Sequence, residues 1–374
     1  MPVDTIIHAA AGADLTAVAS SFALPATVAG VAPLGSGNVN ATYLVQLADG
    51  GRAVLQRLNT AVFQRPELVM ANIRRVGDHV RRRLAAPGVL GVHGRWEVPT
   101  LVPTLTGADG LVLNGQVWRV LTFVADAHCP ETIESPTQAQ ELGRGLGIFH
   151  RLIHDLPTDE LADTLEGFHI TPLYLQRFEA VAAAPTRPLC ATAERCCAFV
   201  AARHGLAPVL ERARAAGRLP LRPIHGDPKV SNVMLDRHTG RAVALIDLDT
   251  VKPGLVHTDI GDCLRSGANP AGEEATDLAA VRFDLELAEA ILRGYMGAAG
   301  DVLSDADHEH LYDAIRLLPF ELGLRFLTDH LEGDVYFRSN RPGHNLERAQ
   351  VQFRLTESVE AQESEIRALL EALR

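Results

Sequence analysis

Cysteines, aromatic residues and long apolar runs are scarce in this chain of 374 residues. The five cysteines are scattered and odd in number, and their spacing fits neither a zinc site nor a disulfide framework, which favours a reducing compartment. No run approaches the roughly 18 apolar residues of a membrane span. The first residues carry no basic segment typical of a signal peptide. We therefore expect a cytoplasmic protein that meets its substrate away from membranes.

Positive charge is also in deficit, with 35 Lys and Arg residues against 46 Asp and Glu residues and a formal net charge of -11. Binding to DNA or RNA depends on clustered Lys and Arg, so this balance argues against a nucleic-acid partner. The one basic run, residues 81–83, follows a helical pattern and is typical of a solvated helix end. The sequence does not indicate an oligomeric state.

Hydrophobic residues make up 47% of the chain, which is enough for a packed globular fold. Short strand patterns occupy residues 28–57, a helical pattern follows at 66–84, and another strand pattern covers 117–124. Helical spacing dominates the remainder, in residues 137–153, 172–183, 191–216, 275–296, 307–331 and 345–373. A strand pattern at residues 224–246 interrupts this helical part of the chain.

These patterns predict an α+β fold with two lobes. Residues 1–124 would form a small, β-rich N-terminal lobe, and residues 125–374 a larger, mainly helical C-terminal lobe. A cleft between two lobes is the natural place for a ligand.

The strongest chemical signal is the segment 225–232, with the sequence HGDPKVSN, followed by Asp247 at the end of a strand pattern. Phosphoryl transfer to an alcohol needs a carboxylate that orients the hydroxyl and accepts its proton, and oxygen ligands that hold Mg²⁺ against the phosphates. Asp227 can supply the carboxylate, and Asn232 and Asp247 the metal ligands. Loop, strand and second Asp occur in the required order, which argues against mere turn caps.

This segment resembles the signature of the aminoglycoside phosphotransferase and choline kinase superfamily, distant relatives of protein kinases, and the resemblance extends over nearly the whole chain. It implies a bilobal kinase-like fold, use of ATP and Mg²⁺, Asp227 as catalytic base, and Asn232 and Asp247 as metal ligands. His225 would shape the loop. Asp249 either contacts the metal or substrate or caps the following turn, and the sequence leaves both interpretations open.

A glycine-rich turn after the first strand pattern is a candidate for phosphate binding, because its backbone amides can approach phosphate oxygens where no Cβ intervenes. Its residues are Gly35, Ser36, Gly37 and Asn38. Alone the pattern is weak, but its position at the start of a β-rich lobe favours a functional interpretation.

The next strand should carry a cation for the phosphates, where kinases place a Lys. This chain has Gln56 and Arg57 instead, and strand alternation points them to opposite faces. Gln56 is in register with the kinase Lys, whereas Arg57 would need a shifted register. Glu67 is a candidate ion-pair partner or a helix-start acid favoured by the helix dipole. The strand at 119–124 is interpreted as the entry to a hinge, with no side-chain role.

Further segments look like the N-acetylhexosamine 1-kinases, which phosphorylate the anomeric hydroxyl of N-acetylglucosamine (GlcNAc) and N-acetylgalactosamine (GalNAc). They are residues 43–45, 55–60, 246–251 with 253–254, 259–262, 265–269 and 324–337. The resemblance implies that Arg325 and Tyr336 contact the sugar.

Without the resemblance, the residues near the expected sugar site also fit other roles. Glu321, Arg325 and Asp329 also share one helical face and would fit a surface salt-bridge ladder. Asp262 and Arg265 either line the acceptor pocket or simply start a helix.

Two other functions compete with a sugar 1-kinase. One is a kinase of the same superfamily for another acceptor: an aminoglycoside, a choline-like amino alcohol or a different sugar. Cationic acceptors favour acidic or aromatic sites, and an aromatic content of 5% weakly favours a neutral sugar. The other is a non-catalytic nucleotide-binding protein. The presence of Asp227, Asn232 and Asp247 argues against it, and only Gln56 is in its favour.

Overall fold

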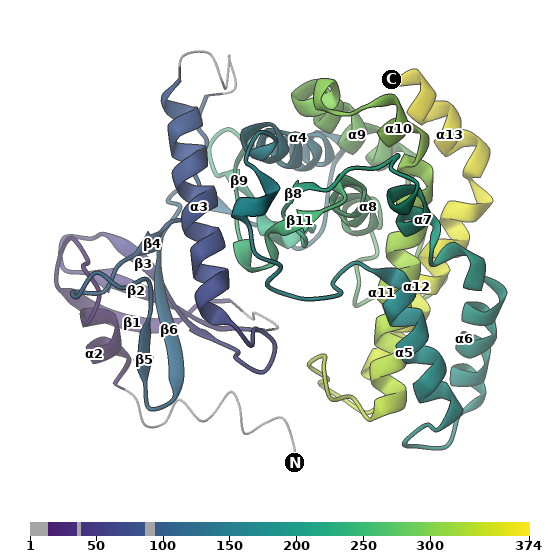
Figure 1. The fold of residues 1–374 in the computed structure, drawn as a ribbon, viewed down its shortest axis with the longest axis horizontal. Helices are drawn as coiled ribbons and strands as arrows, with labels where there is room; N and C mark the ends of the chain where they lie inside the picture. Colours follow the sequence, from purple (N-terminus) through teal and green to yellow (C-terminus); the bar gives the residue numbers. More distant parts are fainter. Residues whose placement is uncertain (1–13, 36–38, 87–93) are drawn as a thin grey trace.

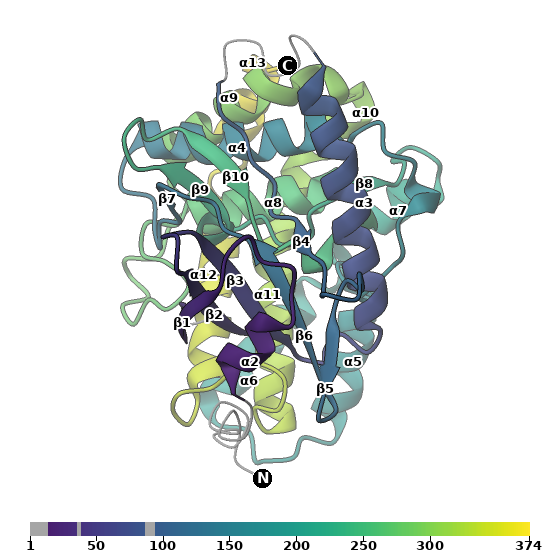
Figure 2. The same cartoon turned by 90° about the vertical axis from the view of Figure 1, so that its left-hand side faces the viewer.

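The computed structural model describes residues 14–35, 39–86 and 94–374. The N-terminal region holds a six-stranded antiparallel sheet in the order β1-β2-β3-β6-β4, with β5 paired to β6 (Figures 1 and 2). Its strands are β1 (Val28–Pro33), β2 (Ala41–Leu47), β3 (Arg52–Leu58), β4 (Leu101–Val102), β5 (Leu111–Leu113) and β6 (Gln116–Thr122).

The two faces of this sheet have different roles, because side chains alternate along each strand. One face is apolar: Tyr43, Leu55 and Trp118 are buried there beneath the short helix α2 (Leu15–Ser20). The other face carries a polar row across β2, β3 and β6, in which Thr42 pairs with Gln56 and Gln56 with Arg119. This polar face is turned towards the C-terminal region.

Helix α3 (Pro66–Ala85) lies between the sheet and the C-terminal helices (Figure 1). Pro66 begins the helix, where its fixed φ angle and missing N–H carry no penalty. The buried Asn72 side chain donates hydrogen bonds to the carbonyl oxygens of Ala162 at 2.8 Å and Val251 at 2.9 Å. Helix α3 is therefore attached to the C-terminal region as well as to the sheet.

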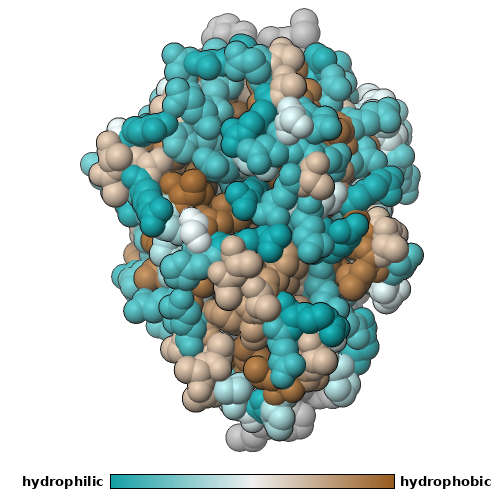
Figure 3. Space-filling model, turned by 90° about the vertical axis from the view of Figure 1, so that its right-hand side faces the viewer, coloured by the Kyte–Doolittle hydropathy of each residue, from teal (hydrophilic) through white to brown (hydrophobic). Residues whose placement is uncertain are grey.

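The C-terminal region is mainly helical. Its helices are α4 (Pro136–Ile153), α5 (Thr171–Ala183), α6 (Ala191–Ala202), α7 (Val209–Ala215), α8 (Val256–Gly267), α9 (Leu285–Ala299), α10 (Asp305–Glu309), α11 (Leu311–Glu332), α12 (His344–Ala361) and α13 (Glu363–Ala372). On the face shown in Figure 3, hydrophobic residues lie in separate patches between hydrophilic ones. No helix in the described part of the chain is both long and apolar enough to span a membrane.

Helices α4 and α9 approach unusually closely because glycines face each other at their contact. A Cβ added at Gly143 would lie 1.8 Å from the Ile291 carbonyl oxygen, and one at Gly294 would lie 2.0 Å from the Gln140 carbonyl oxygen. This contact holds α4, which passes behind the loops of the candidate site.

Short strands in the middle of the C-terminal region position those loops. They are β7 (Ala127–His128), β8 (Arg222–Ile224), β9 (Val233–Asp236), β10 (Ala242–Leu245) and β11 (Lys252–Gly254), with β10-β9-β7 forming one small sheet and β11-β8 another. The segment 225–232 leaves β8, and Asp247 follows β10. The 3-10 turns η4 (Val230–Asn232) and η5 (Leu248–Thr250) belong to these two loops.

The order of strands and helices agrees with the sequence patterns, but four of the expected helices differ in extent. Those expected at 307–331 and 345–373 are each divided, at His310 and at Gln362. The helix expected at 275–296 begins only at Leu285, because Asp284 caps α9 and the preceding Val281 and Phe283 are anchored in the core. The helix expected at 191–216 is interrupted after Ala202 by a 3-10 turn (His204–Leu206) and Pro208.

Candidate active site

The loop after β8 has a backbone that only glycine can adopt at one position. Gly226 has a φ of +89°, and a Cβ there would lie 2.7 Å from the Thr250 carbonyl oxygen. The His225 ring bonds to the Ile246 carbonyl oxygen at 2.9 Å, and the Ile246 N–H donates to the Asn232 carbonyl oxygen at 2.9 Å. The loop that carries Asp227 and Asn232 is therefore joined to the strand end that carries Asp247.

Asp227 lies in this loop with its side chain 28% exposed. One carboxylate oxygen, Oδ2, accepts hydrogen bonds from Lys229 Nζ at 2.5 Å and Asn232 Nδ2 at 3.2 Å. Burial opposes ionisation, but the Lys229 ammonium outweighs it and holds the pKa of Asp227 below its ordinary value. Asp227 is thus a carboxylate with its other oxygen, Oδ1, left without a partner among the described residues.

The Lys229 contact was not anticipated from the sequence. The available signal was a Lys two positions after Asp227 in the same loop, where the chain is short enough to fold the ammonium back onto the carboxylate.

Asn232 and Asp247 present oxygen atoms of the kind that Mg²⁺ prefers. The Asn232 amide nitrogen is committed to Asp227, which leaves its Oδ1 without a hydrogen-bond donor among the described residues. Asp247 has a left-handed backbone with a φ of +65° and an exposed side chain. Desolvation by surrounding protein, together with the charges of Asp249 and Asp227, raises the pKa of Asp247 to about 7. A cation would relieve this concentration of negative charge.

No group of three or more His, Cys, Asp or Glu side chains within residues 14–35, 39–86 and 94–374 could hold a metal ion. In phosphotransfer sites Mg²⁺ binds through one or two protein oxygens, and phosphates and water complete its coordination. The donor set of Asn232 and Asp247 therefore fits a magnesium ion that arrives with a nucleotide.

Buried groups behind the loop hold its backbone. The Asp259 carboxylate accepts the backbone N–H groups of His225 at 2.7 Å and Gly226 at 2.8 Å, and also bonds to His150 Nε2 at 2.8 Å. His150 in turn contacts the Tyr295 hydroxyl at 2.9 Å. His150 therefore lies behind the loop, and Asp259 is a supporting residue that sequence reasoning did not identify.

The predicted phosphate-binding turn is only partly described. Gly35 has the left-handed φ of +69° that glycine favours, whereas Ser36, Gly37 and Asn38 lie outside the described residues. Strand register places Gln56 on the polar face of the sheet and Arg57 on the face that carries Trp118. The sequence left open which of the two residues faces the C-terminal region. In the structure that residue is Gln56.

Among the described residues, the ion pair that kinases form between the strand Lys and a helix acid has no counterpart. Glu67 is exposed and forms no ion pair with any described residue. Instead, Arg119 Nη2 lies 2.5 Å from Asp249 Oδ1, and both Arg119 and Asp249 are almost completely buried. The sequence analysis gave the strand at 119–124 no side-chain role. The missed signal was a single charged residue in the middle of an apolar strand.

Asp249 differs from both interpretations that the sequence left open. Its Oδ1 pairs with Arg119, and its Oδ2 accepts a hydrogen bond from Asn40 Nδ2 at 2.7 Å. Both oxygens are therefore used by the N-terminal region.

A cavity of about 360 Å³ opens beside Asp227. Its walls contain Arg325 and Tyr336, the two residues expected to contact a sugar, together with Asp262 and Arg265. Of the alternatives for the last two, lining the pocket agrees with the structure, and their side chains form an ion pair at 2.7 Å.

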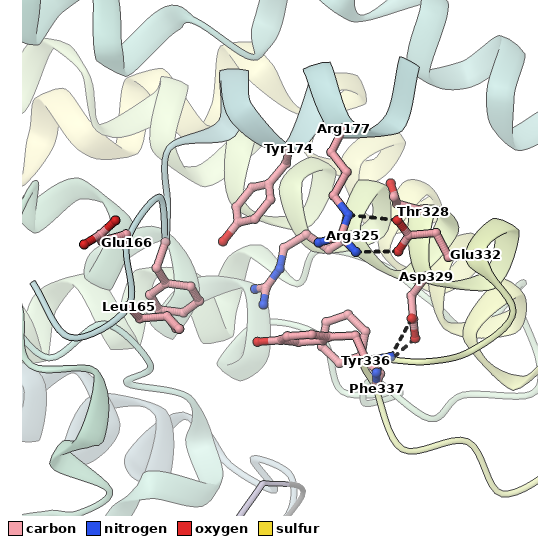
Figure 4. Close-up of a pocket in the computed structure, with 11 residues that line it drawn as sticks. Leu165, Glu166, Tyr174, Arg177, Arg325, Thr328, Asp329, Glu332, Tyr336 and Phe337 are labelled. Carbon is pink, nitrogen blue, oxygen red and sulfur yellow. Dashed lines mark hydrogen bonds and ion pairs between the residues drawn. The ribbon is translucent and has the colours of Figure 1, made fainter. Parts of the chain in front are cut away.

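Arg325 lies where this cavity meets a side chamber of about 180 Å³. Its guanidinium projects between Tyr174 and Tyr336 (Figure 4), with the guanidinium carbon 5.1 Å and 6.0 Å from the two ring centroids. The rings of Phe168 and Phe337 lie 5.2 Å and 5.3 Å from it. Arg325 makes no hydrogen bond or ion pair to any described residue, so its N–H groups remain available to a ligand.

The salt-bridge ladder on α11 does not form. Glu321 bonds to His169 Nδ1 at 2.8 Å and to the Thr171 hydroxyl at 2.5 Å. Asp329 accepts the backbone N–H groups of residues 335–337 and thereby fixes the segment that carries Tyr336 (Figure 4).

His169 was also not anticipated from the sequence. Its second ring nitrogen, Nε2, bonds to the Gly226 carbonyl oxygen at 2.7 Å, so both ring nitrogens face acceptors. Burial lowers the pKa of His169, but the Glu321 carboxylate outweighs burial and raises it above the ordinary value. A buried ion pair therefore joins α11 to the loop of Asp227.

Solved structures share this fold. An aminoglycoside phosphotransferase from Alicyclobacillus acidocaldarius is similar with a TM-score of 0.59 and 18% identity over 95% of this chain and 96% of that one. An amicoumacin kinase in complex with AMP-PNP and Ca²⁺ matches with a TM-score of 0.61 and 16% identity, covering 93% and 95%. A choline kinase from Cryptosporidium parvum matches with 0.57 and 13% identity, covering 91% of each.

These likenesses confirm the expected α+β kinase-like fold. A sequence model described as the phosphotransferase enzyme family, APH, matches residues 30–300, which include nearly all of the sheet, both loops of the site and the whole of α9. The chain belongs to the APH phosphotransferase enzyme family.

Proposed function

We propose that this phosphotransferase is an ATP- and Mg²⁺-dependent kinase that converts N-acetylhexosamines, GlcNAc or GalNAc, to their 1-phosphates. Residues 1–124 would bind the nucleotide, through Gly35, Ser36, Gly37 and Asn38 and the strand of Gln56 and Arg57. Residues 125–374 would supply catalysis and the acceptor site. The observation that carries the proposal is a single cavity that holds Asp227, Arg325 and Tyr336.

The charges around the cavity favour a neutral acceptor. Six carboxylates line it, against five Lys and Arg residues and the His169 imidazole, whose pKa is raised. Each carboxylate except Glu131, which is exposed, is paired with a cation. A cationic acceptor such as choline or an aminoglycoside would find little uncompensated negative charge to bind.

The aromatic rings lead to the same conclusion. Four rings around one point are typical of a site for a quaternary ammonium group. Here Arg325 already occupies that point. Its five N–H donors suit the hydroxyl and amide oxygens of a sugar. Among the acceptors allowed by the family, an N-acetylated sugar fits better than an amino alcohol.

In the proposed reaction Asp227 orients the acceptor hydroxyl and takes its proton as the oxygen attacks the γ-phosphorus of ATP and ADP leaves. Asn232 and Asp247 would hold magnesium, which supplies neutralisation of the phosphate charge when bound. The AMP-PNP and Ca²⁺ in the amicoumacin kinase support a nucleotide with a divalent ion in this fold. Arg325 and Tyr336 would fix the sugar ring, so that catalysis derives from positioning and electrostatics.

Binding calorimetry in the presence of Mg²⁺ and a non-hydrolysable ATP analogue tests the acceptor directly. We expect GlcNAc and GalNAc to bind, glucose to bind more weakly, and choline and kanamycin not to bind. Tighter binding of choline or kanamycin than of either N-acetyl sugar would reject the sugar assignment while leaving the kinase family in place.

A further inference from the structure

No lysine stands on the sheet to contact a nucleotide. The chain has only two lysines, Lys229 and Lys252. Lys229 is paired with Asp227, and Lys252 with Asp163, both in the C-terminal region. Gln56, which faces the site, is neutral. A polyphosphate nevertheless needs cations near it, because several negative charges would otherwise be desolvated together in the cleft.

Arg119 lies beside Gln56 on the same face of the sheet. The Gln56 Oε1 atom accepts hydrogen bonds from Arg119 Nε at 2.9 Å and Nη2 at 2.7 Å, and Gln56 Nε2 donates to the Thr42 hydroxyl at 3.1 Å. A Lys at position 56 would repel the guanidinium, whereas the amide orients it. The unusual residue on β3 is thus complementary to a cation on β6.

The guanidinium links three segments that a nucleotide would have to contact. Asp249, its ion-pair partner, lies two residues after Asp247 and also accepts from Asn40 Nδ2. Asn40 leads from the glycine-rich turn into β2, and its Oδ1 accepts the Asn59 N–H at 2.9 Å. The sheet, the exit of the turn and the loop of Asp247 therefore meet at one buried ion pair.

Burial makes this pair a poor stabiliser and a good positioning device. Arg119 is 1% exposed and Asp249 2% exposed, and desolvating both charges offsets much of their attraction. In addition, Arg119 Nη1 is buried without an acceptor among the described residues. An unpaired buried donor is costly, so an arrangement that includes one has to be explained by something other than stability alone.

We propose that Arg119 is the positioning cation of the nucleotide site. From β6 it holds Asp249, and through Asp249 it fixes the left-handed backbone of Asp247 in the orientation that receives the metal–polyphosphate group. Gln56 orients the guanidinium. The inference rests on the proposed nucleotide site, but it does not depend on the identity of the acceptor.

A double-mutant cycle on nucleotide binding tests this assignment. Calorimetry would compare MgADP, ADP in EDTA, and adenosine for the wild type, Arg119→Met, Asp249→Asn and the double variant. We expect each single variant to weaken the binding of MgADP about tenfold or more, while the affinity for adenosine changes less than about twofold. Because Arg119 acts through Asp249, the double variant should lose no more affinity for MgADP than one single variant does.

The ratio of the affinity for ADP with magnesium to the affinity for ADP in EDTA separates the two roles. A purely structural role of Arg119 would leave this ratio unchanged. That ratio should fall towards one in Arg119→Met. Arg203→Met is the control, because Arg203 likewise forms an ion pair with a carboxylate, the partly buried Glu360 at 2.6 Å, but away from the site. It should leave the ratio unchanged.

A second variant covers the case in which Arg119→Met does not fold. Gln56→Lys combined with Arg119→Gln moves the cation from β6 to β3 and keeps the pair of side chains. It should recover most of the MgADP affinity that Arg119→Gln loses.

Three results would overturn the proposal: additive losses in the cycle, an unchanged magnesium ratio in Arg119→Met, or no recovery in the exchanged pair. Failure of the wild type to bind MgADP would instead reject the proposed nucleotide site.

Discussion

At the residue scale, the clearest expectation concerns Asp227, whose carboxylate is kept ionised by Lys229. Asp227→Asn retains the shape and the contact with Asn232 but cannot accept a proton. We expect kcat to fall by roughly 10²- to 10⁴-fold, the usual contribution of a general base. Steady-state kinetics would measure this, and calorimetry should find MgADP affinity little changed. Wild-type turnover in this variant would remove Asp227 from the chemistry.

Arg325 should act on the acceptor rather than on the nucleotide, because it lines the cavity of Asp227 and has no hydrogen-bond or ion-pair partner among the described residues. Arg325→Met preserves the apolar stem between the rings. Loss of charged hydrogen bonds worth about 1.5–3 kcal/mol should raise KM for the sugar by roughly 10- to 150-fold. The KM for ATP should stay within about twofold.

Arg177→Met is the matched comparison for Arg325, since Arg177 lines the side chamber but is committed to Glu332 at 2.6 Å. It should leave the KM for the sugar near the wild-type value. Equal effects of the two substitutions would show that Arg325 has no special contact with the acceptor.

At the scale of elements, the His169–Glu321 pair makes stability depend on pH. The folded-state pKa of His169 is raised and that of Glu321 is lowered. The pair therefore contributes fully between about pH 4.5 and 6.5, the ordinary values of the two groups. The histidine contribution is lost as pH rises through the raised pKa of His169. The glutamate contribution is lost as pH falls through the lowered pKa of Glu321.

His169→Asn should accordingly lower the free energy of unfolding by about 1.5–3 kcal/mol near pH 6, with a smaller difference near pH 9. Asn tolerates the positive φ of +62° at this position. Urea unfolding across this pH range would measure it, with the exposed His238→Asn as the control. A loss that is independent of pH would mean that His169 is neutral in the folded protein.

The glycine contact of α4 and α9 gives a second prediction at this scale. Gly143→Ala would place a methyl group against the Ile291 carbonyl and force the helices apart. We expect a loss of about 1–3 kcal/mol in the free energy of unfolding, the usual cost of overpacking. Gly297→Ala, on the exposed side of α9 with nothing within 4 Å of the added Cβ, should be neutral or stabilising by up to about 1 kcal/mol. Equal behaviour of the two variants would contradict the close contact.

Local sequence patterns predicted a helix well where a single residue type, such as a Pro in the first turn, defines its start. Pro66 is the first residue of α3, and Ser135 caps α4 directly before Pro136. Tertiary contacts decided the exceptions: Val281 and Phe283 are held in the core, which keeps the residues before Asp284 out of the helix. Helical spacing alone could not reveal that anchoring.

The same limit applies to the site. The loop motif placed Asp227, Asn232 and Asp247 on segments that the structure does join. His169, Asp259 and Arg119 could not be found in this way, because each acts through a partner distant in sequence: Glu321, the backbone of His225, and Asp249. Only fold geometry brings such pairs together.

At the scale of the whole molecule, the N-terminal and C-terminal regions meet through Asn72 of α3 and through the ion pair of Arg119 on β6 with Asp249. A nucleotide bound at this junction should stabilise both parts at once. At 100 times its dissociation constant, MgADP should add about 2.7 kcal/mol to the free energy of unfolding. Hydrogen exchange should slow in both 41–58 and 225–254. Protection confined to one segment would place the nucleotide elsewhere.

The most direct measurement is ADP release from ATP and Mg²⁺ with a panel of acceptors: GlcNAc, GalNAc, glucose, galactose, choline and kanamycin. Phosphorus NMR would identify the phosphorylated position. A sugar kinase built around Asp227, Arg325 and Tyr336 should be most active on the two N-acetyl sugars, with the phosphate on the anomeric oxygen. Activity confined to choline or kanamycin, or phosphate on another hydroxyl, would contradict it.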